Sequence, residues 1–209
     1  MRRSLAAAAV AVALAACGSA PAPELGPGRA WHIAYNGYGH ISARRQGDAV
    51  RLTLKPARPE SPAGTHAALV LSASRWRDFT AKILVRTNHQ LRRPHPNPWE
   101  VGWVLWHYVN DRRFYYIILK PNGWELGKED PAYPGGQRFL ATVTSPVFPP
   151  GRWYSIRVQQ RGNVIRVDVD GRRLVRFVDR QRPYLAGQIG LYVEDASATF
   201  EPVAVAAAP

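Results

Sequence analysis

The chain has 209 residues and carries 28 Lys and Arg against 15 Asp and Glu, a formal net charge of +13 at pH 7. This length allows one domain with a sizeable core. The single cysteine excludes an intrachain disulfide and a cysteine-based zinc site. The charge suits acidic glycans, anionic envelope polymers or nucleic acid. Because the arginines are spread along the sequence, we expect loose attraction to anionic surfaces and no specific nucleic-acid partner.

The first 28 residues have the pattern of an export signal followed by a tether. A basic start (Met1–Arg3) precedes an apolar run (Leu5–Ala13) about half as long as a bilayer-spanning helix. Leu14-Ala15-Ala16-Cys17 resembles the lipobox of bacterial lipoproteins, whose cysteine takes a diacylglyceryl group. We therefore expect a signal peptide over 1–16, lipidation of Cys17, and a Pro/Ala/Gly tether over 17–28. The domain is then extracytoplasmic and lipid-anchored to the bacterial cell membrane; the alternative is a secretory signal with a chance cysteine.

From Trp31 onward the pattern predicts short strands separated by Gly/Pro-rich turns. The stretch Pro98–Asp130 holds four of the seven tryptophans and reads as three strands, with turns at Asn110–Arg112 and Pro121–Gly123. Asp170-Gly171 predicts a hairpin turn. The other predicted strands are Trp31–Tyr35, Ala49–Leu54, Ala67–Ser72, Phe79–Leu91, Arg138–Val143, Trp153–Gln159, Val164–Val169, Arg172–Val178, Gly187–Val193 and Ala198–Val205.

Outside the signal, no helical periodicity exceeds about two turns. Many short strands with Gly/Pro turns indicate an all-β fold, an antiparallel sandwich or jelly roll. We expect one such domain over residues 29–206.

The segments GRWYSIRVQQRGNVIRVDVDGRRLVRFVD and GQIGLYVEDASATFEPVAV carry a resemblance to a known superfamily. A Gly-x-Trp opening, an Asp-Gly hairpin and a Gly-x-x-Gly-Leu strand resemble the closing half of concanavalin A-like (laminin G-like) jelly rolls. Within that fold, the chain is similar to the group around the 3-keto-disaccharide hydrolase domain and to sugar-binding sandwiches near family 16 glycoside hydrolases. The resemblance implies an all-β, antiparallel two-sheet jelly-roll sandwich with its ligand on the outer face of a concave sheet.

The sequence departs from these relatives in two places. The Glu-x-Asp-x-x-Glu motif of family 16 is absent. The final strand carries Phe200-Glu201 where relatives often carry Phe-Asp, an acid that helps to hold a structural calcium ion. The resemblance therefore leaves a structural calcium open, and no other metal ligand set is predicted.

Strand alternation suggests which side chains face the groove that the resemblance implies. If Phe79, Ile83 and Val85 face the core, then Arg86, Asn88 and Gln90 face the groove. If Val101, Trp103 and Leu105 face the core, then Glu100, Trp106 and Tyr108 face it. The neighbours expected on the same sheet are Tyr116, Lys120, Glu125, Lys128, Arg138, Tyr192 and Glu194.

A mixture of aromatic rings, planar donors and carboxylates suits a sugar. The apolar face of a pyranose stacks on a ring, and its hydroxyls need donors and acceptors at fixed angles. Two alternatives stay open. The tryptophans are core anchors, or Glu100, Glu125, Lys120 and Lys128 form ion pairs on a solvated face.

The catalytic prediction rests on Glu100 and Glu125, since a glycosidase needs two carboxylates about 5–10 Å apart. Glu129-Asp130 ends a strand and is predicted to serve a turn or contact a cation. His107 is predicted to be a hydrogen-bonded core histidine. No nucleophile elbow, phosphate loop or dinucleotide motif is present.

Three functions follow from these observations. The first is a lipid-anchored module that binds a carbohydrate or envelope glycan. The second is a glycoside hydrolase or lyase acting on a glycoside or a 3-keto-sugar. The third is a structural or adhesive envelope lipoprotein, for which Trp106 and Tyr116 would both be buried.

Overall fold

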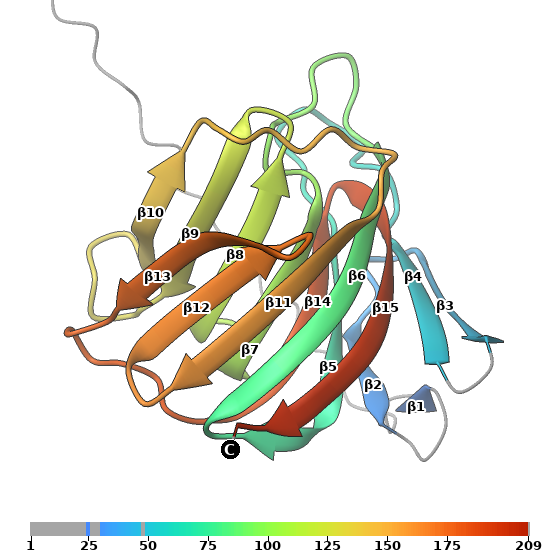
Figure 1. Cartoon of the computed structure of the whole chain (residues 1–209). Coiled ribbons are helices and arrows are strands. Elements are labelled where there is room, and N and C mark those ends of the chain that lie inside the picture. Colours follow the sequence, from blue (N-terminus) through green and yellow to red (C-terminus); the bar gives the residue numbers. More distant parts are fainter. Residues whose placement is uncertain (1–23, 26–29, 47–48, 209) are drawn as a thin grey trace, which may run out of the picture.

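The structure is a computed structural model that describes residues 24–25, 30–46 and 49–208. The predicted signal peptide, Cys17 and most of the tether lie outside the described residues. The described chain is all-β: two antiparallel sheets pack face to face as a sandwich (Figure 1). This confirms the predicted fold class. Among the described residues no helix is long and apolar enough to cross a membrane.

One sheet has eight strands, and its centre is completed by a strand from late in the chain. Two residues of the predicted tether form its edge strand. In spatial order, the strands are β1 (Glu24–Leu25), β2 (Trp31–Tyr35), β5 (Ala67–Trp76), β14 (Gly187–Glu194), β7 (Gly102–Asn110), β8 (Arg113–Lys120), β9 (Gly123–Glu129) and β10 (Gln137–Val143).

The second sheet has seven strands and lies in front of the first in Figure 1. The last strand of the chain lies between two much earlier ones. In spatial order, the strands are β13 (Arg172–Val178), β12 (Val164–Val169), β11 (Tyr154–Arg161), β6 (Phe79–Gln90), β15 (Ala196–Ala207), β4 (Ala49–Lys55) and β3 (His40–Gln46).

Glycine turns connect the strands as the sequence predicts. Asp170 and Gly171 have φ of 50° and 80°, the left-handed pair that a two-residue hairpin needs. Gly123 has φ of 132°, and a Cβ there would lie 2.0 Å from the Val143 carbonyl oxygen. Only glycine therefore fits the turn between β8 and β9.

The main core lies between the two sheets and follows strand alternation. Phe79, Ala81, Ile83 and Val85 point into it from β6, each at most 3% exposed, which confirms that part of the prediction. His107 is also buried; its ring nitrogens lie 2.7 Å and 2.9 Å from the carbonyl oxygens of Tyr184 and Arg77. The predicted core histidine is confirmed, and burial lowers its pKa.

A second apolar cluster lies on the outer face of the eight-stranded sheet, away from the main core. Strand β7 serves both clusters: Val104 and Trp106 pack in the main core, whereas Trp103 and Leu105 pack in the outer cluster. The prediction for β7 had these faces reversed. Trp106 is fully buried between the sheets, where its indole donates to Gln160 Oε1 at 2.7 Å.

The prediction that Arg86, Asn88 and Gln90 share a sheet with the other groove residues is wrong, because β6 belongs to the seven-stranded sheet. Their alternation is correct, but it directs them to the opposite side of the sandwich from the outer cluster. Asn88 donates to Thr199 Oγ1 at 3.0 Å. Gln90 donates to the carbonyl oxygen of Asn97 at 2.7 Å.

The residues present do not fit the calcium ion suggested for the last strand. The Glu201 carboxylate forms an ion pair with Arg51 at 2.8 Å. Within the described ranges, no group of three or more His, Cys, Asp or Glu residues is placed to hold a metal ion.

Candidate functional site

The outer face of the eight-stranded sheet aligns aromatic rings with carboxylates across neighbouring strands. Cross-strand partners point to the same face, so the strand registers define three rows. The first row is Tyr192, Trp103, Ile118 and Glu125, the second is Leu105, Tyr116, Gly127 and Phe139, and the third is Phe114, Glu129 and Gln137.

Tyr116 is the centre of a polar network on this face. Its hydroxyl donates to Glu125 Oε1 at 2.8 Å and accepts from Gln137 Nε2 at 3.0 Å. Lys120 donates to the other Glu125 oxygen at 3.0 Å. Gly127 makes room for the hydroxyl, since a Cβ there would lie 2.2 Å from it. Burial, and then the Glu125 charge, raise the Tyr116 pKa well above its ordinary value, so the hydroxyl stays a proton donor.

The aromatic floor of this face is closely packed. The Trp103 ring lies 4.9 Å from Tyr116 and 5.4 Å from Tyr192. Tyr116 is fully buried and Trp103 is 7% exposed. Both Trp106 and Tyr116 are therefore buried, one in the main core and the other in the outer cluster, as the structural or adhesive alternative predicts. The accessible part of this face lies elsewhere.

The accessible part lies on β9 and β10. Phe139 is 58% exposed and pairs in register with Gly127. Beside it, Glu129 is partly exposed and pairs in register with Gln137. Burial raises the Glu129 pKa to about 7. Within the described part of the chain, its carboxylate accepts no hydrogen bond from another residue. Such a carboxyl group takes and releases a proton near neutral pH.

Glu129 and Phe139 were not predicted as site residues from the sequence. Glu129 was grouped with Asp130, whose predicted role is confirmed: Asp130 accepts from the Ala132 amide at 3.1 Å and from Arg182 at 3.0 Å. The alternation of β9 was the available signal, because it places Glu129 on the same face as Glu125.

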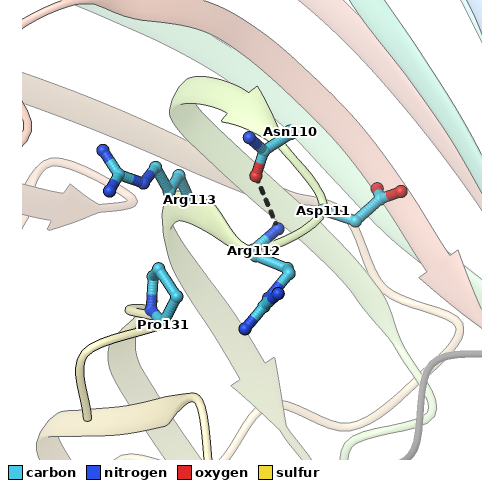
Figure 2. Close-up of a pocket in the computed structure, with 5 residues that line it drawn as sticks. All are labelled: Asn110, Asp111, Arg112, Arg113 and Pro131. Atoms are coloured by element: carbon cyan, nitrogen blue, oxygen red, sulfur yellow. Dashed lines mark hydrogen bonds between the residues drawn. The ribbon is translucent and has the colours of Figure 1, made fainter.

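A pocket of about 270 Å³ opens beyond the ends of β8 and β9, next to the register pair Phe114–Glu129. Asn110, Asp111, Arg112, Arg113 and Pro131 line it (Figure 2). The Asn110 side chain accepts from the Arg112 amide at 3.0 Å and fixes the turn between β7 and β8. Figure 2 shows Arg112 and Arg113 flanking Pro131 while Asp111 points away. The pocket therefore presents guanidinium donors beside the Glu129 end of the face.

On strands β7 and β14 of the outer face, phenol and carboxyl groups pair with one another. Tyr192 donates to Glu194 at 3.0 Å, and Tyr108 donates to Asp111 at 2.8 Å. Burial is the main cause that raises the pKa of Glu194. These side chains bond one another, whereas Glu129 does not.

The structure does not bring Glu100 and Glu125 together as a catalytic pair. Strand β8 lies between β9 and the strand that Glu100 precedes, so their strands are not neighbours. Glu100 is fully buried; it accepts from Arg92 at 2.5 Å and from Asn97 at 2.8 Å. Arg92 also binds Asp195. Glu100 therefore belongs to a buried ion cluster and does not face the groove.

Lys128 and Arg138 are also corrected, because they point to the inner side of the sheet. Lys128 is fully buried and donates to Asp179 Oδ2 and to the Gln181 carbonyl oxygen, both at 2.7 Å. Arg138 lies 3.8 Å from the other Asp179 oxygen. Of the predicted ligand-binding residues, Tyr116, Lys120, Tyr192 and Glu194 lie on the outer face, and Glu125 joins them there.

Comparison with known proteins gives one family and several similar folds. The model of the 3-keto-alpha-glucoside-1,2-lyase-like domain matches residues 29–205. The carbohydrate-binding module CBM66 from Bacillus subtilis has a TM-score of 0.57 at 16% identity, over 82% of this chain and 91% of the module. No curated protein sequence matches the chain.

Two further solved structures share the sandwich. The Bacillus licheniformis beta-glucanase has a TM-score of 0.51 at 11% identity, over 82% of this chain and 88% of the enzyme. The VIP36 exoplasmic/lumenal domain, in a Ca²⁺/Man3GlcNAc-bound form, has a TM-score of 0.52 at 15% identity, over 86% of this chain and 83% of that domain. At these identities the likeness shows the fold alone.

Proposed function

Because the chain belongs to the family of 3-keto-alpha-glucoside-1,2-lyase-like domains, we propose that it binds a glucoside oxidised at C3 and cleaves it by elimination between C1 and C2. The proposed site is the accessible part of the outer face, around Glu129 and Phe139. The family description supports the substrate class, and the residues of this face support the chemistry.

The reaction needs a base more than it needs a nucleophile. A keto group at C3 acidifies the hydrogen on C2, because the carbanion left behind is stabilised as an enolate. The base takes the C2 proton, the electron pair forms the C1=C2 double bond, and the glycosidic C1–O bond breaks. The leaving oxygen departs with the aglycone and takes up a proton. No water is consumed in this step.

Glu129 is the observation that carries the proposal. A general base works best when its pKa lies near the working pH, and burial raises the pKa of Glu129 to about 7. Its partner in register, Gln137, is an amide that suits a sugar hydroxyl or keto oxygen. Phe139 offers an exposed ring on which the apolar face of a pyranose stacks.

A second candidate is a carbohydrate-binding domain without turnover. It is favoured by the exposed rings of Phe139 and Tyr133, which are 58% and 43% exposed. In that case the site would bind oxidised and unoxidised glucosides alike, and no aglycone would be released from either compound.

The test compares a 3-keto-α-glucoside with its unoxidised parent, using the purified full chain. We expect aglycone release from the oxidised compound only, since only that compound has an acidic C2 hydrogen. We also expect Phe139→Ala to weaken binding about 5- to 10-fold through the lost stacking. Tyr38→Ala is the matched control, because that ring is 80% exposed on a distant turn. Equal release from both compounds would contradict elimination, and binding of both without release would favour the second candidate.

We further propose that the domain is a lipoprotein, anchored outside the cytoplasm through Cys17. The basic start, apolar run and lipobox-like sequence before that cysteine support this. Cys17→Ser is expected to move the chain from the membrane fraction to the soluble fraction and to remove the mass of the lipid. A membrane-bound Cys17→Ser chain would contradict the proposal.

A further inference from the structure

The outer face of the seven-stranded sheet carries cations directly opposite one another. Lys82 on β6 pairs in register with Arg157 on β11, and Arg166 on β12 pairs with Arg176 on β13. Paired side chains project to the same face with Cβ atoms about 5 Å apart. All four are exposed. Like charges so placed repel each other, so these pairs oppose the stability of the sheet.

The same face continues across the sheet with a third pair of like charges. Arg44 on β3 pairs with Arg51 on β4. The carboxylates on this face already have partners: Asp168 binds Arg173, and Glu201 binds Arg51. Among the described residues, Lys82, Arg157, Arg166 and Arg176 form no salt bridge. Several of the arginines that are scattered along the sequence therefore lie together on this one face.

One corner of this face is hollowed. The pair His40–Lys55 borders a pocket of about 450 Å³ that Arg58, His89 and Arg93 also line. None of the described lining residues is acidic. The pocket is large enough for a discrete anionic group and offers it only neutral or basic neighbours.

We infer that this basic face binds an acidic polysaccharide through its carboxylate groups. Arginine predominates here, and its planar fork matches a carboxylate with two parallel hydrogen bonds. Trp153 adds a partly exposed ring beneath the Arg51 guanidinium, 5.3 Å from it, which helps to hold this fork in place. A discrete pocket and planar guanidinium forks suit the carboxylates of a polymer better than the diffuse charge of a lipid surface. The face lies on the opposite side of the sandwich from Glu129, so the inference does not depend on the proposed function.

The test measures binding of the purified full chain to polygalacturonate, with the fully methyl-esterified polymer as the uncharged probe. We expect the triple variant Lys82→Gln, Arg157→Gln, Arg166→Gln to weaken binding about tenfold or more, with a smaller salt dependence. The matched control, Arg75→Gln, Arg77→Gln, Arg180→Gln, removes the same charge from exposed positions at the end of β5, just after it, and after β13. We expect it to change affinity less than about threefold, as the long-range field alone predicts.

Thermal melting separates loss of the surface from loss of the fold. The triple variant removes both repelling pairs and also the Arg157 charge opposite Asp168, so we expect it to melt close to the wild-type temperature. Equal losses in the two triple variants, or equally tight binding of the esterified polymer, would overturn the inference. So would tighter binding of phosphatidylglycerol vesicles or of duplex DNA than of polygalacturonate, since the face would then serve a membrane or a nucleic acid.

Discussion

Glu129→Gln is expected to lower turnover of a 3-keto-α-glucoside by about 10²- to 10⁴-fold, the range over which a positioned general base contributes. Glutamine keeps the shape of the side chain but cannot accept the C2 proton. Binding of the substrate should change far less, because the amide still fits the site. Glu60→Gln, in an exposed loop, is the control and should keep wild-type turnover.

The pH profile gives the same test without a mutation. The base is active as the carboxylate, and its pKa is about 7. The wild-type rate should therefore rise from pH 5 to pH 8 with its midpoint near pH 7. A flat profile over this range, or full turnover by Glu129→Gln, would remove Glu129 from the mechanism.

The same variant should be more stable than the wild type above neutral pH. The folded-state pKa of about 7 lies above the ordinary value of 4.5, so the folded protein holds this proton more tightly than the unfolded chain. That stabilisation is fully present below pH 4.5 and is lost as the pH rises to about 7. Because solvent screens the partly exposed carboxylate, we expect a gain of about 1 kcal/mol for glutamine at pH 8, or about 2–4 °C in Tm. At pH 4.5 the wild type and Glu129→Gln should have the same Tm. If the variant is more stable at pH 8 and still loses turnover, unfolding is not the cause of that loss.

Lys128→Met is expected to lower the free energy of unfolding by about 3–5 kcal/mol. The Lys128 ammonium donates to Asp179 at 2.7 Å and to the carbonyl oxygens of Gln181 and Arg182 at 2.7 Å and 3.1 Å. Burial alone would raise the Asp179 pKa, but hydrogen bonds from Lys128 and Tyr115 bring it below its ordinary value. Without Lys128, a fully buried carboxylate loses its main counter-charge. Urea unfolding followed by tryptophan fluorescence measures the loss.

Two further variants identify the cause of that loss. Adding Asp179→Asn to Lys128→Met should restore part of the stability, because the uncompensated charge is then gone. Arg173→Met breaks an exposed ion pair with Asp168 and should cost at most about 1 kcal/mol. If Lys128→Met costs no more than Arg173→Met, the buried pair does not hold the sandwich together.

Most strands and turns were predictable because their signals are local, although β1 and β3 were not predicted. Leu52 and Leu54 alternate with polar residues in β4, and glycines mark the turns at Gly123 and Gly171. Alternation did not predict the faces of β7 correctly, because apolar residues occupy both faces of this strand. When both faces of a strand are buried, alternation no longer says which face is which.

The wrong predictions of site residues arise because the site depends on contacts between residues that are far apart in the sequence. Arg86 and Asn88 follow the correct alternation, but β6 pairs with β11 and β15, and no local pattern reveals which sheet a strand joins. Lys128 reads as a surface residue until Asp179, 51 positions later, is placed beside it. The raised pKa of Glu129 likewise depends on burial, which the sequence does not show directly.

The strand order also determines when the domain can fold. Strand β14 joins β5 to β7, and β15 joins β6 to β4, so residues 187–207 complete the centres of both sheets (Figure 1). A ribosome-bound chain lacking these residues has two incomplete half-sheets on each side and no closed core. Folding must therefore follow synthesis of nearly the whole chain, and the long loops closed at that moment make it slow. Removal of the last strand should abolish the fold, whereas loss of the edge strand β10 should leave both sheet centres intact.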